Sequence, residues 1–167
     1  MIYFIISLVL IFIVILSIFL INIKKLKEID DKLNIIEEKI KELLNIKKDN
    51  LDKITHDLND KDLINNLKCE NDNIFKFEQN LFDIKFEIKK KINNNKYTPS
   101  NEIKPLIDDL DLEEKIEGLK DYYNSNSIKF NEILYKKPFN YIYKIFKFKP
   151  KNLFKIQMSD ELEILKN

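Results

Sequence analysis

The sequence MIYFIISLVLIFIVILSIFLINI, residues 1–23, contains no charged side chain, and Lys24, Lys25 and Lys27 follow it directly. Nearly every residue between positions 2 and 21 is Ile, Leu, Val or Phe. A helix of about 20 such residues is roughly 30 Å long, which matches the hydrocarbon core of a bilayer. A helix also satisfies its own backbone hydrogen bonds, as lipid requires. The stretch therefore predicts a transmembrane anchor over residues 1–23, with residues 2–22 in contact with the bilayer.

Two alternative interpretations are a cleaved secretory signal peptide and a helix buried in a soluble core. A signal peptide has a basic start, an apolar core of about 7–15 residues and a small-residue cleavage site. Here no basic residue precedes a longer apolar run, and no small-x-small pattern closes it. The one apolar span predicts a single-pass protein of the cell membrane. Because basic flanks stay cytoplasmic, the lysines after the span predict that the N-terminus is outside and the C-terminal domain is in the cytoplasm.

The composition excludes several classes of protein. The net charge of +1 in 167 residues makes a nucleic-acid partner unlikely. One glycine leaves no phosphate-binding loop and makes hairpins unlikely. A single cysteine rules out an internal disulfide and suits a reducing cytoplasm. Ala, Arg and Trp are absent while Ile, Asn and Lys abound, so lysine richness also reflects a bias toward AT-rich codons.

Apolar residues recur at intervals of three and four along three segments, which predicts an all-α fold. The first segment has the heptad pattern of a coiled coil and predicts one helix over about 24–67, loosened near Asn45–Asn50. The second predicts a helix over 74–93, after a turn at Cys69–Asn73. The stripes are Leu26, Ile29, Leu33, Ile36, Ile40 and Leu43, then Leu51, Ile54 and Leu58; and Ile74, Phe77, Leu81, Ile84, Ile88 and Ile92.

The third helix is expected over 108–136, with acidic residues at its start and Gly118 inside it. Its stripe is Leu112, Ile116, Leu119, Tyr123, Asn126, Phe130 and Ile133. A short aromatic helix over 139–148 and a flexible tail over 158–167 complete the prediction. The expected architecture is an N-terminal transmembrane helix followed by an antiparallel bundle of long helices over residues 24–157.

The sequence offers little for catalysis, so we predict no enzyme activity. Its one histidine, His56, lies on a charged helix, and a solvated side chain fits better there than a general base. Cys69 has no second cysteine with which to build a zinc site. Adjacent acids such as Glu113/Glu114 point about 100° apart on a helix and do not converge on a metal. We therefore expect no catalytic, cofactor-binding or metal-binding residue, and no cofactor.

One segment, residues 129–155, interleaves lysines with aromatic residues and contains Glu132 as its only acid. Such a pattern suits three roles: packing of the aromatic residues on the bundle with the lysines in water, contact with an anionic membrane surface, or binding of single-stranded nucleic acid. Packing is favoured and nucleic acid is the weakest of the three. Whether the segment at 135–155 contacts lipid is left open.

The C-terminal half contains a basic residue before an aromatic-Tyr-Asn, a second aromatic-Asn seven residues on, and a later proline and phenylalanines. These residues are Lys120, Tyr123, Asn124, Phe130, Asn131, Pro138, Phe146 and Phe148. The pattern resembles that of the LemA family of bacterial membrane-anchored helical-bundle proteins, in which the later part is a Phe-Pro and a Gly-Phe segment. Lys47 to Leu51 is similar to a second family stretch on the first long helix. Lys137 stands where the family has an aromatic residue, and Lys147 stands where it has glycine.

The resemblance implies a membrane-tethered bundle on the cytoplasmic side without a defined enzyme activity. The motif residues then have structural roles: Tyr123 and Phe130 face the bundle, and Asn124 and Asn131 bond a neighbouring helix. Two functions follow. One is a LemA-like protein that presents its bundle to an unknown protein partner. The other is a membrane-anchored, self-associating coiled-coil scaffold built on the Leu26–Leu43 stripe.

Overall fold

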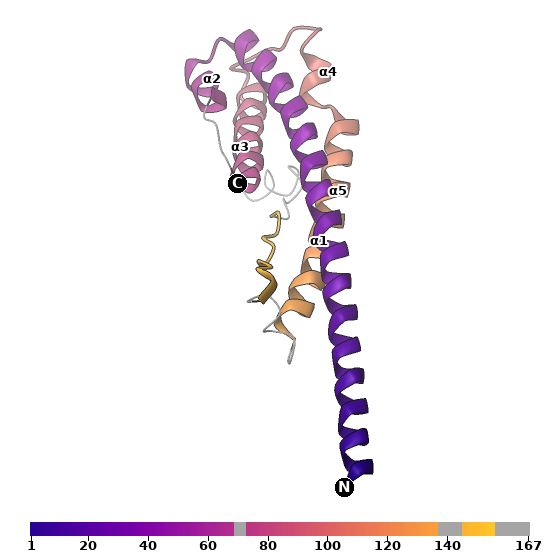
Figure 1. Cartoon of the computed structure of the whole chain (residues 1–167). Helices are drawn as coiled ribbons and strands as arrows, with labels where there is room; N and C mark the ends of the chain where they lie inside the picture. The colour runs from indigo at the N-terminus through magenta and orange to yellow at the C-terminus, as the bar shows by residue number, and fades with distance from the viewer. Residues whose placement is uncertain (69–72, 137–144, 156–167) are drawn as a thin grey trace. The chain divides into compact units, whose positions relative to one another are not determined.

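The computed structural model describes residues 1–68, 73–136 and 145–155, and within these ranges every regular element is a helix (Figure 1). The all-α prediction is confirmed. The elements are α1 (Ile2–Leu58), α2 (Lys61–Lys68), α3 (Ile74–Asn93), α4 (Lys104–Ile107) and α5 (Leu110–Tyr135). Pro138, most of the helix predicted over 139–148 and the tail predicted over 158–167 lie outside the described residues.

Helix α1 is 57 residues long, and its N-terminal part is the apolar stretch. An 18-residue window of α1 reaches a mean hydropathy of 3.4, and none of that window is buried in the protein. By length and composition the helix can therefore cross a membrane. Its large apolar side chains are exposed, for example Phe12 at 63% and Ile21 at 66%, which in water would be costly and in lipid is favourable.

Helix α1 continues through Asn45–Asn50, where loosening was predicted, and ends at Leu58 instead of near Leu67. The break has a local cause. Asn59 takes a φ of 53°, a left-handed conformation that asparagine tolerates better than most residues. The Asp60 carboxylate then accepts hydrogen bonds from the backbone N–H groups of Asp62 and Leu63, at 3.1 and 3.2 Å, and caps α2.

The starts of the later helices also follow from side-chain chemistry. The Asn73 side chain accepts hydrogen bonds from two N–H groups in the first turn of α3, which covers the predicted range. Pro105 lies in the first turn of α4, where its missing N–H costs nothing. The Asp109 carboxylate accepts a hydrogen bond from the Leu112 N–H, so α5 begins at Leu110, close to the predicted start.

The chain divides into two compact units. Unit 1 comprises residues 1–36 and 122–152, and unit 2 comprises residues 37–121 and 153–167. Each unit contains a part of α1 and a part of α5. The core of unit 1 includes Leu26, Leu33, Ile36, Tyr123, Phe130 and Leu134, and the core of unit 2 includes Ile40, Leu44, Leu51, Ile54, Leu63, Leu67, Leu81, Ile84, Ile88, Ile107, Leu112 and Ile116.

Within unit 2, α3 runs in the same direction as α1, and α5 runs antiparallel to both (Figure 1). The expected antiparallel packing is thus met by α5. Tyr97 donates a hydrogen bond to Asp57, and Lys91 pairs with Asp60, so the later part of α3 and the residues after it lie beside the end of α1. The Asn80 side chain on α3 donates a hydrogen bond to the Asn66 carbonyl on α2, so α2 lies beside α3.

Candidate functional site: buried ion pairs and an asparagine clamp

Among the residues of unit 2 that the structure describes, three charged side chains are buried. Lys47 on α1, Glu78 on α3 and Lys120 on α5 are 4%, 3% and 1% exposed. Each occupies a position at helical spacing from buried apolar neighbours, so its charge cannot reach bulk water. Burial of a charge is costly unless an opposite charge and hydrogen bonds compensate it. The arrangement of their partners is therefore the most informative feature of the molecule.

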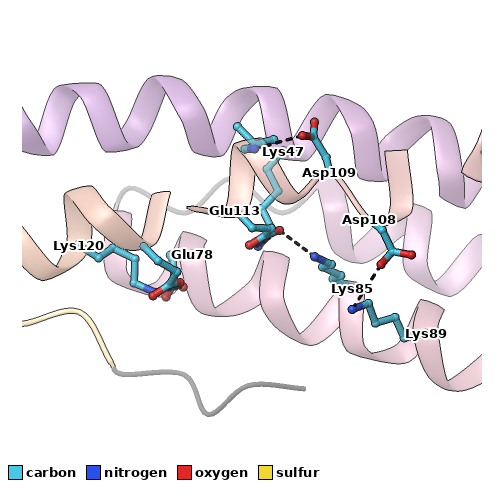
Figure 2. Close-up of polar contacts among 10 residues, drawn as sticks. Lys47, Glu78, Lys85, Lys89, Asp108, Asp109, Glu113 and Lys120 are labelled. Atoms are coloured by element: carbon cyan, nitrogen blue, oxygen red, sulfur yellow. Dashed lines mark hydrogen bonds and ion pairs between the residues drawn. The ribbon is translucent and has the colours of Figure 1, made fainter. Parts of the chain in front are cut away.

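Lys120 is held by two carboxylates. Its ammonium group lies 2.9 Å from Glu78 Oε1, as Figure 2 shows for these two residues, and 2.8 Å from Glu117 Oε1. Burial on its own would lower the pKa of Lys120, but the hydrogen bonds that its ammonium donates to Glu117 and Glu78 outweigh burial and raise that pKa above its usual value. The lysine therefore stays charged, as a fixed cation that joins α5 to α3.

Glu113 on α5 joins the other two helices. Its carboxylate lies 3.0 Å from Lys47 Nζ on α1 and 2.9 Å from Lys85 Nζ on α3 (Figure 2). Burial alone would raise the pKa of Glu113, but the charges of Lys47 and Lys85 and their hydrogen bonds hold it below its usual value. One carboxylate thus links α1, α3 and α5 at a single level of unit 2.

A small cavity lies beside Lys47, Lys85 and Glu113, and Asn50 and Asp109 also line it. It offers about 10 Å³ to the centres of water-sized molecules. That is room for about one water, which the polar lining suits. A cofactor or an organic substrate needs a pocket of some hundreds of Å³, so this cavity does not serve as a small-molecule site.

The ion pairs define how α3 and α5 align. Glu78 on α3 pairs with Lys120 on α5. Lys85, seven residues later on α3, pairs with Glu113, which is seven residues earlier on α5, so the two helices are antiparallel. Lys89 and Asp108, 3.7 Å apart, continue the series. A parallel arrangement would place Glu78 beside Glu113 and Lys85 beside Lys120. Because like charges repel strongly when desolvated, these four residues favour the antiparallel register over that alternative.

A second polar arrangement, the asparagine clamp, lies in unit 1 and consists of Asn131 and the residues it holds. The Asn131 amide donates a hydrogen bond to the Lys151 carbonyl, and its carbonyl accepts one from the Lys151 N–H, both at 2.9 Å. The Lys151 ammonium then lies 2.6 Å from Asp30 Oδ1 and 2.9 Å from Asn34 Oδ1 on α1. The clamp thereby ties the segment after α5 to both α5 and α1.

The residues of the family motif fall in several environments. Tyr123 and Phe130 are buried, as their shared stripe predicts, and Phe130 meets Phe148 edge-on with ring centroids 6.0 Å apart. Asn124 is half-buried. Asn131 bonds the backbone of Lys151, in a segment without regular secondary structure, and not a neighbouring helix as predicted. The remaining motif residue described, Phe146, is 46% exposed.

The other residues singled out from the sequence are solvent-facing or outside the description. Lys24, Lys25 and Lys27, which flank the apolar span, are exposed. The His56 side chain is 62% exposed and lies 3.7 Å from Asp52 on the preceding turn of α1. Cys69 lies outside the described residues. In the part of the chain that the structure describes, no three His, Cys, Asp or Glu side chains gather as a metal site.

Sequence reasoning missed the buried charges for a definable reason. The predicted stripes assign the core to Phe77 and Leu119, but Glu78 and Lys120, one residue further on, are buried instead. A hydropathy pattern assigns the buried position to the apolar residue of each neighbouring pair. The burial of the charged residue becomes evident only when its ion-pair partner on another helix is known. A signal did exist: Glu78 and Lys85 on α3 and Glu113 and Lys120 on α5 repeat the same order of charges at the same spacing of seven.

Comparisons with models of known protein families, with curated protein sequences and with solved structures found no match to this chain. The fold and the buried charges define the class of protein: it is an all-α protein whose long first helix contains a candidate membrane span and whose helical bundle is aligned by buried ion pairs.

Proposed function

We propose that this chain is a LemA-like single-pass membrane protein that presents a cytoplasmic helical bundle to a protein partner and carries out no catalysis. The observation that carries the proposal is the continuity of α1, which runs without a break from the exposed apolar span into the buried core of the bundle. A helix built in this way suits a tether. The site geometry supports a structural role, because the buried charges neutralise one another within unit 2.

The LemA resemblance gains support from Lys147, which stands where the family has glycine. Lys147 takes a φ of 58°, the left-handed region that favours glycine. The burial of Tyr123 and Phe130 and the clamp made by Asn131 are also consistent with motif residues that hold the fold together. These observations concern the packing of the bundle.

The orientation in the membrane can be tested with a single reporter cysteine. Cys69→Ser removes the native thiol, and Lys53→Cys places a new one on an exposed position of α1. A membrane-impermeant maleimide should leave intact cells unlabelled and react after the membrane is permeabilised. Labelling of intact cells would reverse the proposed topology, and recovery of the protein in the soluble fraction would remove the anchor.

The competing function is a coiled-coil scaffold that self-associates through the Leu26–Leu43 stripe. The structure favours the bundle over this alternative because Leu26, Leu33, Ile36 and Ile40 are already buried within the chain. Light scattering of the detergent-solubilised protein should give one copy of 20.1 kDa. In the Cys69→Ser background, Leu33→Cys should not form a disulfide between two copies of the chain. If the chain instead formed a parallel coiled coil, Leu33→Cys would cross-link far more than the exposed control Ile35→Cys.

A further inference from the structure

The two units carry opposite charges. Counted from the sequence, unit 1 has eleven lysines and four acidic residues, a formal net charge of +7. Unit 2 has 18 lysines and 24 acidic residues, a formal net charge of −6. The value of +1 for the whole chain conceals this separation. The positive unit is also the one that contains the apolar span.

The clamp places the end of α5 near the end of the span. Asn131 is tied to Lys151, which is tied to Asp30 on α1. Asp30 lies six residues after Lys24, roughly 9 Å along the helix. Within unit 1, α5 runs antiparallel to α1 (Figure 1). The last turn of α5, from Asn131 to Tyr135, therefore approaches the level of Lys24 and the bilayer surface.

At this end of unit 1 six described residues are exposed and either basic or largely apolar, and the contacts of Phe148 with Phe130 and of Lys151 with Asn131 hold the segment after position 145 against α5. We call this set the basic surface and define it as Tyr135, Lys136, Ile145, Phe146, Lys147 and Lys149. All six side chains are exposed, and the three apolar ones are 60%, 66% and 46% exposed in chain order. Large apolar side chains beside exposed lysines are the combination that binds at a lipid–water interface.

We propose that the basic surface binds anionic lipid headgroups of the bilayer that α1 crosses, with Phe146, Ile145 and Tyr135 entering the interface. The proposal rests on the membrane anchor proposed above. Its lysines complement anionic phosphate groups, and the tether keeps them within reach of the bilayer. Anionic lipids repel the negative charge of unit 2, so the headgroups bind to unit 1 and not to unit 2. A lipid ligand is favoured over nucleic acid because the surface lies at the exit of the span.

The test uses a tryptophan reporter in the full chain, which has no native tryptophan. Phe146→Trp is reconstituted into vesicles of neutral phosphatidylcholine, or of phosphatidylcholine with 30 mol% phosphatidylglycerol, each with and without acyl-chain bromination. We expect a blue-shifted emission that brominated lipid quenches in the anionic vesicles, and weaker quenching in the neutral ones. Tyr135→Trp provides a second reporter if the first variant fails to fold.

Charge variants separate a specific contact from mere tethering. Each lysine near an anionic surface favours binding about fivefold, so replacing Lys136, Lys147 and Lys149 with Gln should weaken the contact roughly 100-fold and abolish the extra quenching. The matched control replaces three exposed lysines of unit 2 with Gln and should leave the quenching unchanged. The control positions are Lys41, Lys53 and Lys61.

Vesicle flotation separates this inference from the proposed anchor. If the chain fails to float with neutral vesicles, the anchor is wrong and the inference falls with it. If the chain floats but both reporters give equal quenching in neutral and anionic vesicles, the anchor stands and the inference is overturned. Loss of the quenching on addition of single-stranded DNA at low salt would also overturn it, in favour of nucleic acid as the ligand.

Discussion

Removal of the Lys120 ammonium tests the account of the buried charges most directly. In Lys120→Met, a side chain of similar length replaces the cation that two carboxylates share. The Lys120 and Glu78 side chains are 2% and 4% exposed, and the pair is separated by 2.9 Å. Breaking such a buried pair by removing one partner costs about 3–5 kcal/mol. We expect Lys120→Met to be among the most destabilising single substitutions in unit 2.

The size of the effect should depend on which partner is removed. In Glu78→Leu, Lys120 keeps its second carboxylate, Glu117, so the loss of stability should be smaller than in Lys120→Met. The double variant Glu78→Leu/Lys120→Met exchanges the pair for apolar side chains of similar volume. Such replacements are neutral or stabilising in other proteins. The double variant should therefore recover most of the stability lost by Lys120→Met.

Thermal unfolding in mild detergent, followed by circular dichroism at the helical band, measures these differences. For a unit of this size 1 kcal/mol is roughly 4–8 °C in Tm, so Lys120→Met should lower Tm by at least about 12 °C. Lys115→Met is the control, because Lys115 lies on the same helix and is exposed. A Tm for Lys120→Met equal to that of the control, or a double variant as unstable as the single one, would refute the reasoning.

Three further predictions concern single sites. Gly118→Ala should stabilise the fold by about 1 kcal/mol in the same assay, because a Cβ there meets no atom within 4 Å; a lower Tm would contradict this. Lys147→Gly should also stabilise by about 1 kcal/mol through relief of its left-handed backbone, and Lys149→Gly, which has no such backbone, should not. Because the pKa of Glu113 is lower in the folded protein than in the unfolded chain, its contribution is present above the unfolded pKa near 4.5 and is lost as pH falls below it. Glu113→Gln should flatten the loss of Tm between pH 5 and pH 3, while Glu114→Gln should leave it unchanged.

The sequence allowed the helices and the apolar span to be predicted because both depend on local patterns. Periodic Ile and Leu residues define α3 and α5, and the unbroken run of residues 1–23 defines the exposed part of α1. The end of α1 was missed because the apolar pattern continues across Asn59 into α2, and the left-handed turn between them depends on a single residue. The buried charges were missed because Glu78 and Lys120 acquire their partners only when distant segments meet. The clamp was partly anticipated, since Asn131 was expected to make hydrogen bonds, but to a neighbouring helix and not to the backbone of Lys151.

The ion pairs between α3 and α5 have a consequence for how this sequence can change over generations. Glu78 and Lys120 are encoded 42 positions apart, and Lys85 and Glu113 are 28 apart. A mutation at one member of a pair leaves a charge in the core until its partner also changes. Chains descended from a common ancestor should therefore exchange these residues in pairs, with reversed or apolar combinations appearing together. Such paired exchange would trace the fold of this protein in sequences too divergent to align by identity.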